Sequence, residues 1–182
     1  PLTHNDNVAW ADSATDEPVL GGLSPFGGDV VREMNRLGML VDLSHVSTDV
    51  MRQALSVTRS PVVFSHSSAR AICDVPRNVP DDVLETLASN GGVCMVAFVS
   101  DFLSSGFARW FEESRHLVAR RGGNSDGFAE LEPVMGERSE IDPPPVVTID
   151  DVVAHIEHIR EVAGVEHIGI GGDYDGSAVM PA

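Results

Sequence analysis

The stretch that decides the fold runs from residue 39 to residue 66, where MLVDLSH (39–45) and PVVFSH (61–66) flank one amphipathic segment. Each flanking run has the composition of a β-strand and ends in a histidine, His45 in the first and His66 in the second. A step of 21 residues between them fits one β-α-β crossover, because the connection needs a dozen or more residues. We therefore predict neighbouring parallel strands with both imidazoles at their carboxyl-terminal edge.

Strand-like and helix-like segments alternate along the rest of the chain. Ser24 is expected to cap a helix that begins at Pro25 and ends at Gly38, since serine, proline and glycine are favoured at these three positions. Further helices are expected over 47–59, 81–90 and 149–163, and strands over 2–4, 39–43, 62–65, 93–99 and 167–170. Strict alternation is typical of a parallel α/β sheet, and strand-end histidines favour a (β/α)8 barrel. The strand over 93–99 is apolar on both faces, so we expect burial on both sides.

Composition bounds the class of protein. The chain has 182 residues, 42% of them hydrophobic, and can bury a core as one domain or part of one. A formal net charge of −16 opposes binding to nucleic acid or to an anionic membrane surface, and no apolar run approaches the roughly 18 residues of a membrane span. Cys73 and Cys94 lack the spacing of a redox or zinc motif and are expected to be buried thiols. The compartment stays open, with the cytoplasm as the default expectation.

Residues 104–145 depart from the alternating pattern. A helix is expected over 107–121, and the following residues, 122–145, are polar, acidic and closed by three prolines. We interpret this stretch as an insertion. It is either a lid over the active edge or a solvated excursion without a role in chemistry.

His45 and His66 together predict a metal site. Neutral imidazole is the commonest nitrogen ligand of zinc, and side chains at the carboxyl ends of neighbouring barrel strands meet in one place. The alternative is that both rings only bond loop backbone. By contrast, His155 and His158 lie on the helix expected outside the barrel and are not predicted to bind metal.

A carboxylate is expected at the same edge. Asp173 follows the strand over 167–170 through Gly171 and Gly172, which let the backbone pass close to other groups. Beside a metal-activated water, this carboxylate could accept a proton and return it to a leaving amine. A structural Gly-Asp turn is the alternative, and Asp175 fits that reading better.

Arg77 is the candidate for binding an anionic group. It lies in a loop stiffened by Pro76 and Pro80, eleven residues after His66, and its planar guanidinium can bind a carboxylate in bidentate fashion. A surface salt bridge is the other reading. Asp42, in the strand that ends at His45, either braces a ligand imidazole or pairs with a neighbouring loop.

Several motifs, in order, resemble the membrane (renal) dipeptidase family. The likeness covers nearly the whole chain except 104–145. The motifs are Leu2-Thr3-His4 with Trp10-Ala11-Asp12, Gly22-Leu23-Ser24-Pro25-Phe26-Gly27, Asn35-Arg36-Leu37-Gly38, Asp42-Leu43-Ser44-His45-Val46-Ser47, Phe64-Ser65-His66-Ser67-Ser68-Ala69, Arg77-Asn78-Val79-Pro80-Asp81 and Gly171-Gly172-Asp173-Tyr174-Asp175-Gly176.

The resemblance implies a metal-dependent (β/α)8 barrel that holds two zinc ions and hydrolyses dipeptides with a hydroxide that bridges the metals. It implies that His45 and His66 bind one zinc ion. It further implies that His4 contacts the scissile carbonyl or its oxyanion, that Arg77 binds the C-terminal carboxylate of the dipeptide, and that Asp173 handles the proton.

The chain departs from the family pattern in two ways. The His-x-Asp pair and the bridging carboxylate of the family would precede residue 1, and Phe102 stands where some relatives place a tyrosine near the substrate carboxylate. We therefore expect residues 1–182 to be a partial catalytic barrel, about strand 4 to strand 8. We also expect this part alone to be inactive.

Two other classes of function stay open. One is another barrel amidohydrolase, such as a deaminase or lactonase, against which Arg77 argues because neutral bases and lactones carry no free carboxylate. The other is a non-catalytic remnant, which a metal count on the whole protein would reveal. A dipeptide substrate is the expected partner, no nucleic acid is expected, and a homodimer is open.

Overall fold

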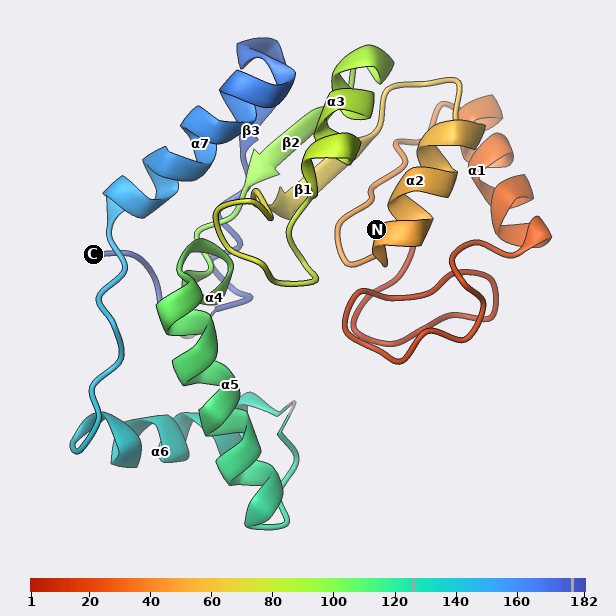
Figure 1. Cartoon of the computed structure of the whole chain (residues 1–182). Coiled ribbons are helices and arrows are strands. Elements are labelled where there is room, and N and C mark those ends of the chain that lie inside the picture. Colours follow the sequence, from red (N-terminus) through yellow and green to blue (C-terminus); the bar gives the residue numbers. More distant parts are fainter. Residues whose placement is uncertain (126, 178) are drawn as a thin grey trace.

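Three short parallel strands form the central sheet, in the spatial order β1-β2-β3 (Figure 1). This computed structural model describes residues 1–125, 127–177 and 179–182. The strands are β1 (Val63–Ser67), β2 (Val93–Val96) and β3 (Ile168–Ile170). The helices are α1 (Pro25–Leu37), α2 (Thr48–Val57), α3 (Asp81–Asn90), α4 (Ser100–Leu103), α5 (Ser105–Arg120), α6 (Phe128–Ser139), α7 (Ile149–Ala163) and the short 3-10 helix η1 (Val165–His167).

Two further segments continue the sheet beyond β1. The amide of Leu43 donates to the carbonyl of Val63 at 2.8 Å, and the amide of Val63 donates to the carbonyl of Val41 at 3.0 Å. The amide of Leu2 donates in turn to the carbonyl of Asp42 at 3.1 Å. Five segments therefore lie side by side in the order of the sequence, as successive β-α-β units require. Within the described residues, the strand expected over 39–43 is reduced to an isolated parallel bridge between Asp42 and Val63.

The helix ends follow their local sequence signals. Ser24 accepts a hydrogen bond from the amide of Gly27 at the start of α1, and Gly38 ends that helix in the left-handed conformation at φ 70°. Ser47 caps α2 through the amide of Val50. The predicted boundaries of α1, α2, α3 and α7 are confirmed to within a residue or two, because caps and glycine stops act locally.

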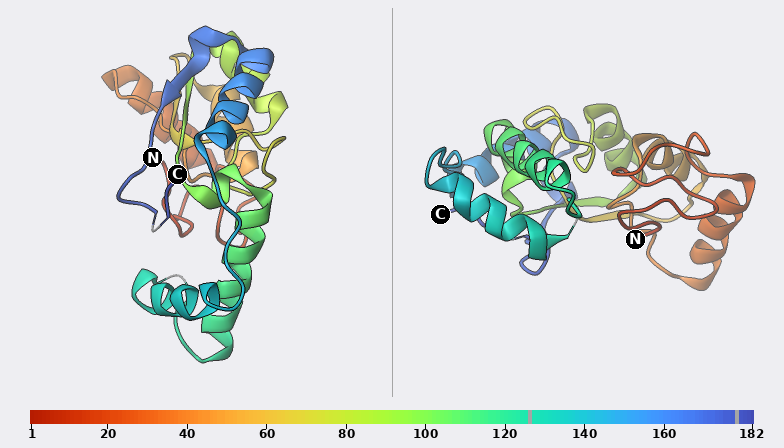
Figure 2. Two further views of the ribbon diagram at one scale, coloured as in Figure 1. Left: turned by 90° about the vertical axis from the view of Figure 1, so that its left-hand side faces the viewer. Right: turned by 90° about the horizontal axis from the view of Figure 1, so that it is seen from below.

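Helices cover one face of the sheet. Both α3 and α7 pack on β2, and α2 packs on α3 (Figures 1 and 2). On that face Cys94 and Val96 are fully buried, whereas Val93 and Met95, which point to the other face, are only half-buried. The predicted burial of this strand on both faces is therefore wrong for the described chain. The face of the sheet that carries Val93 and Met95 is only partly covered by the described residues.

Helices α5 and α6 pack against each other at a steep angle and project from the sheet-bearing body (Figures 1 and 2). The predicted helix over 107–121 corresponds to α5, but α6 falls where the sequence predicted a polar excursion. Trp110 and Val118 of α5 pack with Leu131, Val134 and Met135 of α6 in a small apolar cluster of their own. Among the described residues no helix is both long and apolar enough to cross a bilayer.

Candidate active site

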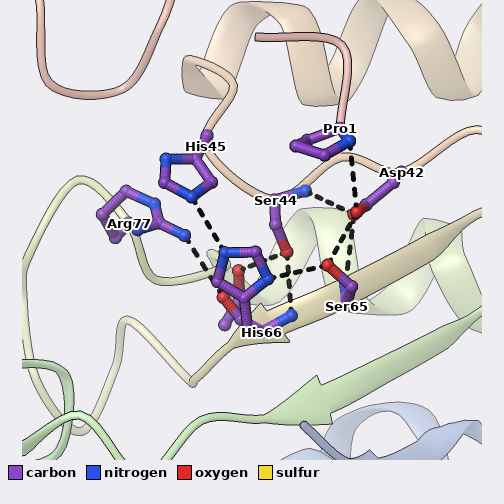
Figure 3. A network of polar contacts seen from close by, with 8 residues as sticks. Pro1, Asp42, Ser44, His45, Ser65, His66 and Arg77 are labelled. Carbon is purple, nitrogen blue, oxygen red and sulfur yellow. Dashed lines mark hydrogen bonds and ion pairs between the residues drawn. The ribbon is translucent and has the colours of Figure 1, made fainter. Parts of the chain in front are cut away.

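His45 and His66 converge at one edge of the sheet. His66 lies in β1, and His45 follows the segment that pairs with β1. Their Nε2 atoms are 2.8 Å apart, with the rings at an interplanar angle of 64° (Figure 3). The two imidazoles thus aim the same nitrogen at a common point, and a metal ion shared there stays a prediction.

The hydrogen-bond chain behind His66 fixes its tautomer. The Ser65 hydroxyl donates to Oδ2 of Asp42 at 2.6 Å, so its oxygen must accept from Nδ1–H of His66 at 2.7 Å (Figure 3). The Nε2 of His66 therefore carries a lone pair. Asp42 also accepts from the amides of Ser44 and Ser65. Asp42 therefore braces the imidazole of His66 through the hydroxyl of Ser65, which is the first of the two roles that the sequence left open for it.

Both imidazoles are neutral at physiological pH. Burial, and then the positive charge of Arg77, lower the pKa of His45 to about 3. Burial and Arg77 likewise lower the pKa of His66. Neutral rings offer the lone pairs that a metal ion requires. The Nδ1 atom of His45 is buried and has no hydrogen-bond partner among the described residues.

His4 joins this pair through its ring. Its imidazole stacks on that of His45 with ring centroids 4.3 Å apart and an interplanar angle of 24°. The residue is exposed, and its carbonyl accepts from the hydroxyl of Ser13 at 2.7 Å. The structure therefore brings together three histidines that are far apart in the sequence. His4 is the member open to solvent and to a ligand.

Arg77 is buried rather than at the surface. Its side chain is 7% exposed, its Nη2 donates to the carbonyl of His66 at 3.3 Å, and its guanidinium lies 4.9 Å from the ring centre of Phe102. Burial lowers its pKa to about 10, so it stays charged at neutral pH. No carboxylate of the described chain forms an ion pair with it, and its Nε has no partner there. The carboxylates of Asp173, Asp101 and Asp42 act on this guanidinium from a distance, and its N–H groups have the geometry to bind an anion. Arg77 forms no surface salt bridge with a described residue.

Asp173 reaches the same edge after β3. The chain can turn there because Gly171 passes over β1: a Cβ on Gly171 would lie 2.0 Å from the carbonyl oxygen of Ser65. The carboxylate lies over Gly176 rather than on either imidazole, and its charge acts on His66 and Arg77. The position of Asp173 at this edge is compatible with carrying a proton. Its contact with Gly176 is equally compatible with a purely structural Gly-Asp turn.

His45 and Asp173 share an unusual backbone conformation. They are the two non-glycine residues of the described chain with positive φ, at 72° and 57°. Such strained conformations persist only where the surroundings enforce them, and they cluster at functional sites. This observation favours a functional role for both residues.

The described residues do not assemble a complete metal site. No group of three or more His, Cys, Asp or Glu side chains within them has the arrangement of a metal cluster. The pair of His45 and His66 fits zinc in donor type and protonation state, but it is one ligand short of the three that catalytic zinc commonly has.

The sequence predicted no role in this region for four of its residues, Ser65, Asp101, Asn78 and His155. Ser65 links Asp42 to His66, and Asp101 lies near Arg77 and Asp173, where burial raises its pKa to about 6. Asn78 and His155 are fully buried behind the site. The side chain of His155 points from α7 towards the sheet and bonds the backbone of Ala69 and Leu103, and His158 contacts Asp81 at 2.8 Å. That neither His155 nor His158 binds metal stays a prediction.

Known proteins resemble this chain along its full length. Residues 1–182 match the sequence profile of a family described as Membrane dipeptidase (Peptidase family M19). The chain is 43% identical over 182 residues to a protein of Schizosaccharomyces pombe named "Uncharacterized dipeptidase C3A11.10c", covering 99% of this chain and 36% of that protein. The chain therefore spans about a third of the length of this curated relative.

Two solved structures share the fold. The "probable dipeptidase PvdM" from Pseudomonas aeruginosa superposes on 98% of this chain and 51% of its own, with a TM-score of 0.77 and 27% identity. An amidohydrolase from Pseudomonas aeruginosa covers 97% of this chain and 42% of its own, with a TM-score of 0.68 and 26% identity. The mixed α/β arrangement with a small parallel sheet is thus that of known dipeptidase structures.

Proposed function

Because the chain belongs to the membrane dipeptidase family, we propose that the whole protein is a zinc-dependent metallopeptidase that hydrolyses dipeptides. The observation that carries the proposal is the approach of the Nε2 atoms of His45 and His66 to 2.8 Å beside the buried guanidinium of Arg77. Paired metal-ligand nitrogens next to a cation for a free carboxylate are what the hydrolysis of a very short peptide requires.

His45 and His66 would hold one zinc ion of this site. Both rings are neutral, and His66 is oriented by Ser65 and Asp42, as ligand histidines commonly are by a partner on the other nitrogen. Zinc supplies Lewis-acid chemistry: it brings the pKa of bound water into the neutral range and polarises a carbonyl. We propose that the rest of the whole protein supplies the remaining ligands and the second ion's site.

Arg77 would bind the C-terminal carboxylate of the substrate. Its bond to the carbonyl of His66 keeps the guanidinium next to a metal ligand, so a group held by Arg77 lies only a short distance from the metal pair. In a dipeptide the terminal carboxylate is separated from the scissile carbonyl by a single residue. This proximity favours dipeptides over longer peptides.

His4 and Asp173 would act on the reacting atoms. His4 is exposed beside His45 and can donate a hydrogen bond to the carbonyl oxygen as negative charge develops on it. Asp173 would take a proton from the attacking water and return it to the departing amine. For this step its carboxylate must turn from Gly176 towards the metal pair.

The five side-by-side segments would form part of a (β/α)8 barrel, about strand 4 to strand 8. Their order in the sheet follows the sequence, and α2, α3 and α7 lie on one side only, as in a barrel wall. The half-buried Val93 and Met95 would then face the barrel interior. The remaining strands would come from the rest of the whole protein.

Substrate selectivity tests the proposal against its rival. The whole zinc-loaded protein should hydrolyse a dipeptide such as Ala-Ala but not its C-terminal amide, and should leave lactones and neutral nucleobases unchanged. Turnover of a lactone or a base without dipeptide cleavage would instead identify another amidohydrolase. Absence of bound zinc together with absence of all turnover would indicate a non-catalytic remnant.

A further inference from the structure

Asn78 joins the segment after β1 to the segment after β2. Its side chain is fully buried, and its Oδ1 accepts from the amide of Ser68 at 3.0 Å. Its Nδ2 donates to the carbonyls of Phe102 at 2.7 Å and Cys73 at 2.8 Å. Both N–H groups of the Asn78 side-chain amide and one of the two lone pairs on its oxygen are thus used within the chain.

His155 makes the same connection one residue further along each segment. It projects from α7, is fully buried, and accepts at Nδ1 from the amide of Ala69 at 3.0 Å. Its Nε2 lies 3.1 Å from the carbonyl of Leu103. Because an amide can only donate and a carbonyl can only accept, the ring is the neutral Nε2–H tautomer. Burial lowers its pKa, which keeps it in that form.

The two side chains form a paired clasp, defined here as Asn78 and His155. Successive amides, of Ser68 and Ala69, donate to it, and successive carbonyls, of Phe102 and Leu103, accept from it. The first two directly follow β1, which carries His66. The clasp thereby sets the spacing between the histidine strand and Phe102.

That spacing determines where the Arg77 guanidinium sits. One face of the guanidinium lies 4.9 Å from the ring of Phe102, and Nη2 bonds to the carbonyl of His66. Arg77 also immediately precedes Asn78 in the chain. A change in the distance between the two segments would therefore move the cation relative to the paired imidazoles, although neither member of the clasp touches them.

We propose that Asn78 and His155 are positioning residues that hold the carboxylate receptor of Arg77 and Phe102 in register with His66, and so determine the affinity for substrates with a free C-terminus. The inference rests on the proposed dipeptidase function. It predicts a loss in binding of free acids, because a displaced guanidinium no longer aligns its two N–H groups with the carboxylate.

His155→Phe and Asn78→Leu test the clasp in the whole zinc-loaded protein. Each should raise KM for Ala-Ala about tenfold or more, with kcat within about threefold and with the weak binding of Ala-Ala amide unchanged. His155→Gln, which keeps one donor and one acceptor, should restore most of the affinity. Equal losses for the acid and the amide, or a fall in kcat at constant KM, would overturn the proposal.

His158→Gln is the matched control. His158 lies on the same helix and ties α7 to Asp81 at 2.8 Å, but it does not reach the segments after β1 and β2. It should lower thermal stability without changing KM. A similar KM shift in this variant would show that any loosening of α7 has the same effect, and would overturn the specific role of the clasp.

Hydrogen exchange separates failure of the clasp from failure of the proposed function. In His155→Phe the amide of Ala69, and in Asn78→Leu the amide of Ser68, should exchange faster than in the wild type, while the amides of α1 should not. Unchanged exchange would overturn the clasp. If the wild type cleaves no dipeptide, the proposed function fails. The hydrogen-exchange rates then still test whether Asn78 and His155 hold the two segments together. If His155→Phe does not fold, His155→Gln and Asn78→Leu carry the test.

Discussion

The Nε2 atoms of His45 and His66 lie 2.8 Å apart, because the two residues end adjacent parallel segments that are joined by helix α2. One ring must donate to the other in the metal-free protein. Since Ser65 leaves the Nε2 of His66 with a lone pair, the donor is His45. Zinc bound at this nitrogen would leave the neutral ring of His45 with its proton on Nδ1, which has no hydrogen-bond partner among the described residues. The hydrogen bond marks the place that the ion would take.

Ser65→Ala should weaken zinc binding by roughly 10- to 100-fold without unfolding the protein, because the imidazole of His66 loses the link to Asp42 that orients it. Competition with a chelator measures the effect. Ser56→Ala is the control, since that hydroxyl bonds only within α2, to the carbonyl of Gln53. Equal zinc affinity in Ser65→Ala and the wild type would remove Ser65 and Asp42 from the metal site.

Arg77→Lys should raise KM for dipeptides far more than it reduces bound zinc, because an ammonium cannot reproduce the planar fork that holds a carboxylate. Steady-state kinetics and a metal assay on the same preparation check both quantities. Arg52→Lys, at an exposed arginine that bonds Asp82, should leave KM unaltered. An unchanged kcat/KM in Arg77→Lys would contradict the role of Arg77.

Gly171→Ala should destabilise the protein and reduce its activity, because the added methyl group would lie 2.0 Å from the carbonyl oxygen of Ser65 and push Asp173 away from the site. Gly136→Ala is the matched control: nothing lies within 4 Å of its added methyl group, in the interior of α6. That control should be neutral or stabilising by up to about 1 kcal/mol in urea unfolding. Wild-type activity in Gly171→Ala would refute the close approach.

The metal-free protein should lose stability as the pH falls from about 6.5 towards 3. The pKa of His45 is about 3 in the folded protein and 6.5 when unperturbed, so the unfolded chain binds the proton first. Asp42 acts in the same direction: hydrogen bonds from Ser65 and Ser44 outweigh burial and lower its pKa. Urea unfolding at pH 7 and pH 4.5 measures the change. His45→Gln should flatten it, and an equally steep decline in that variant would contradict the assignment.

Asp101→Asn should stabilise the protein at pH 7. Burial raises the pKa of Asp101 to about 6 against 3.8 unperturbed, so its contribution to stability is present below pH 3.8 and is lost as the pH rises through 6. The gain over the wild type should shrink to nothing at pH 4 in thermal melts. A destabilised Asp101→Asn at pH 7 would show that the ionised carboxylate is needed, with Arg77 as the cation that lowers its pKa most.

The sequence predicted what depends on local signals. Caps and glycine stops located α1, α2, α3 and α7, and the spacing of His45 and His66 located the site. The tertiary features were missed. Helix α6, which contains Pro133, packs its apolar side chains on Trp110 and Val118 of α5. His155 bonds Ala69 and Leu103, which are both distant from it in sequence.

The zinc position tests the central claim most directly. Crystals of the whole zinc-loaded protein, measured at the zinc absorption edge, should show an anomalous peak about 2.1 Å from one ring nitrogen of His45 and one of His66. His66→Ala should lose that peak. Zinc bound elsewhere, with these two rings still joined by their hydrogen bond, would contradict the account.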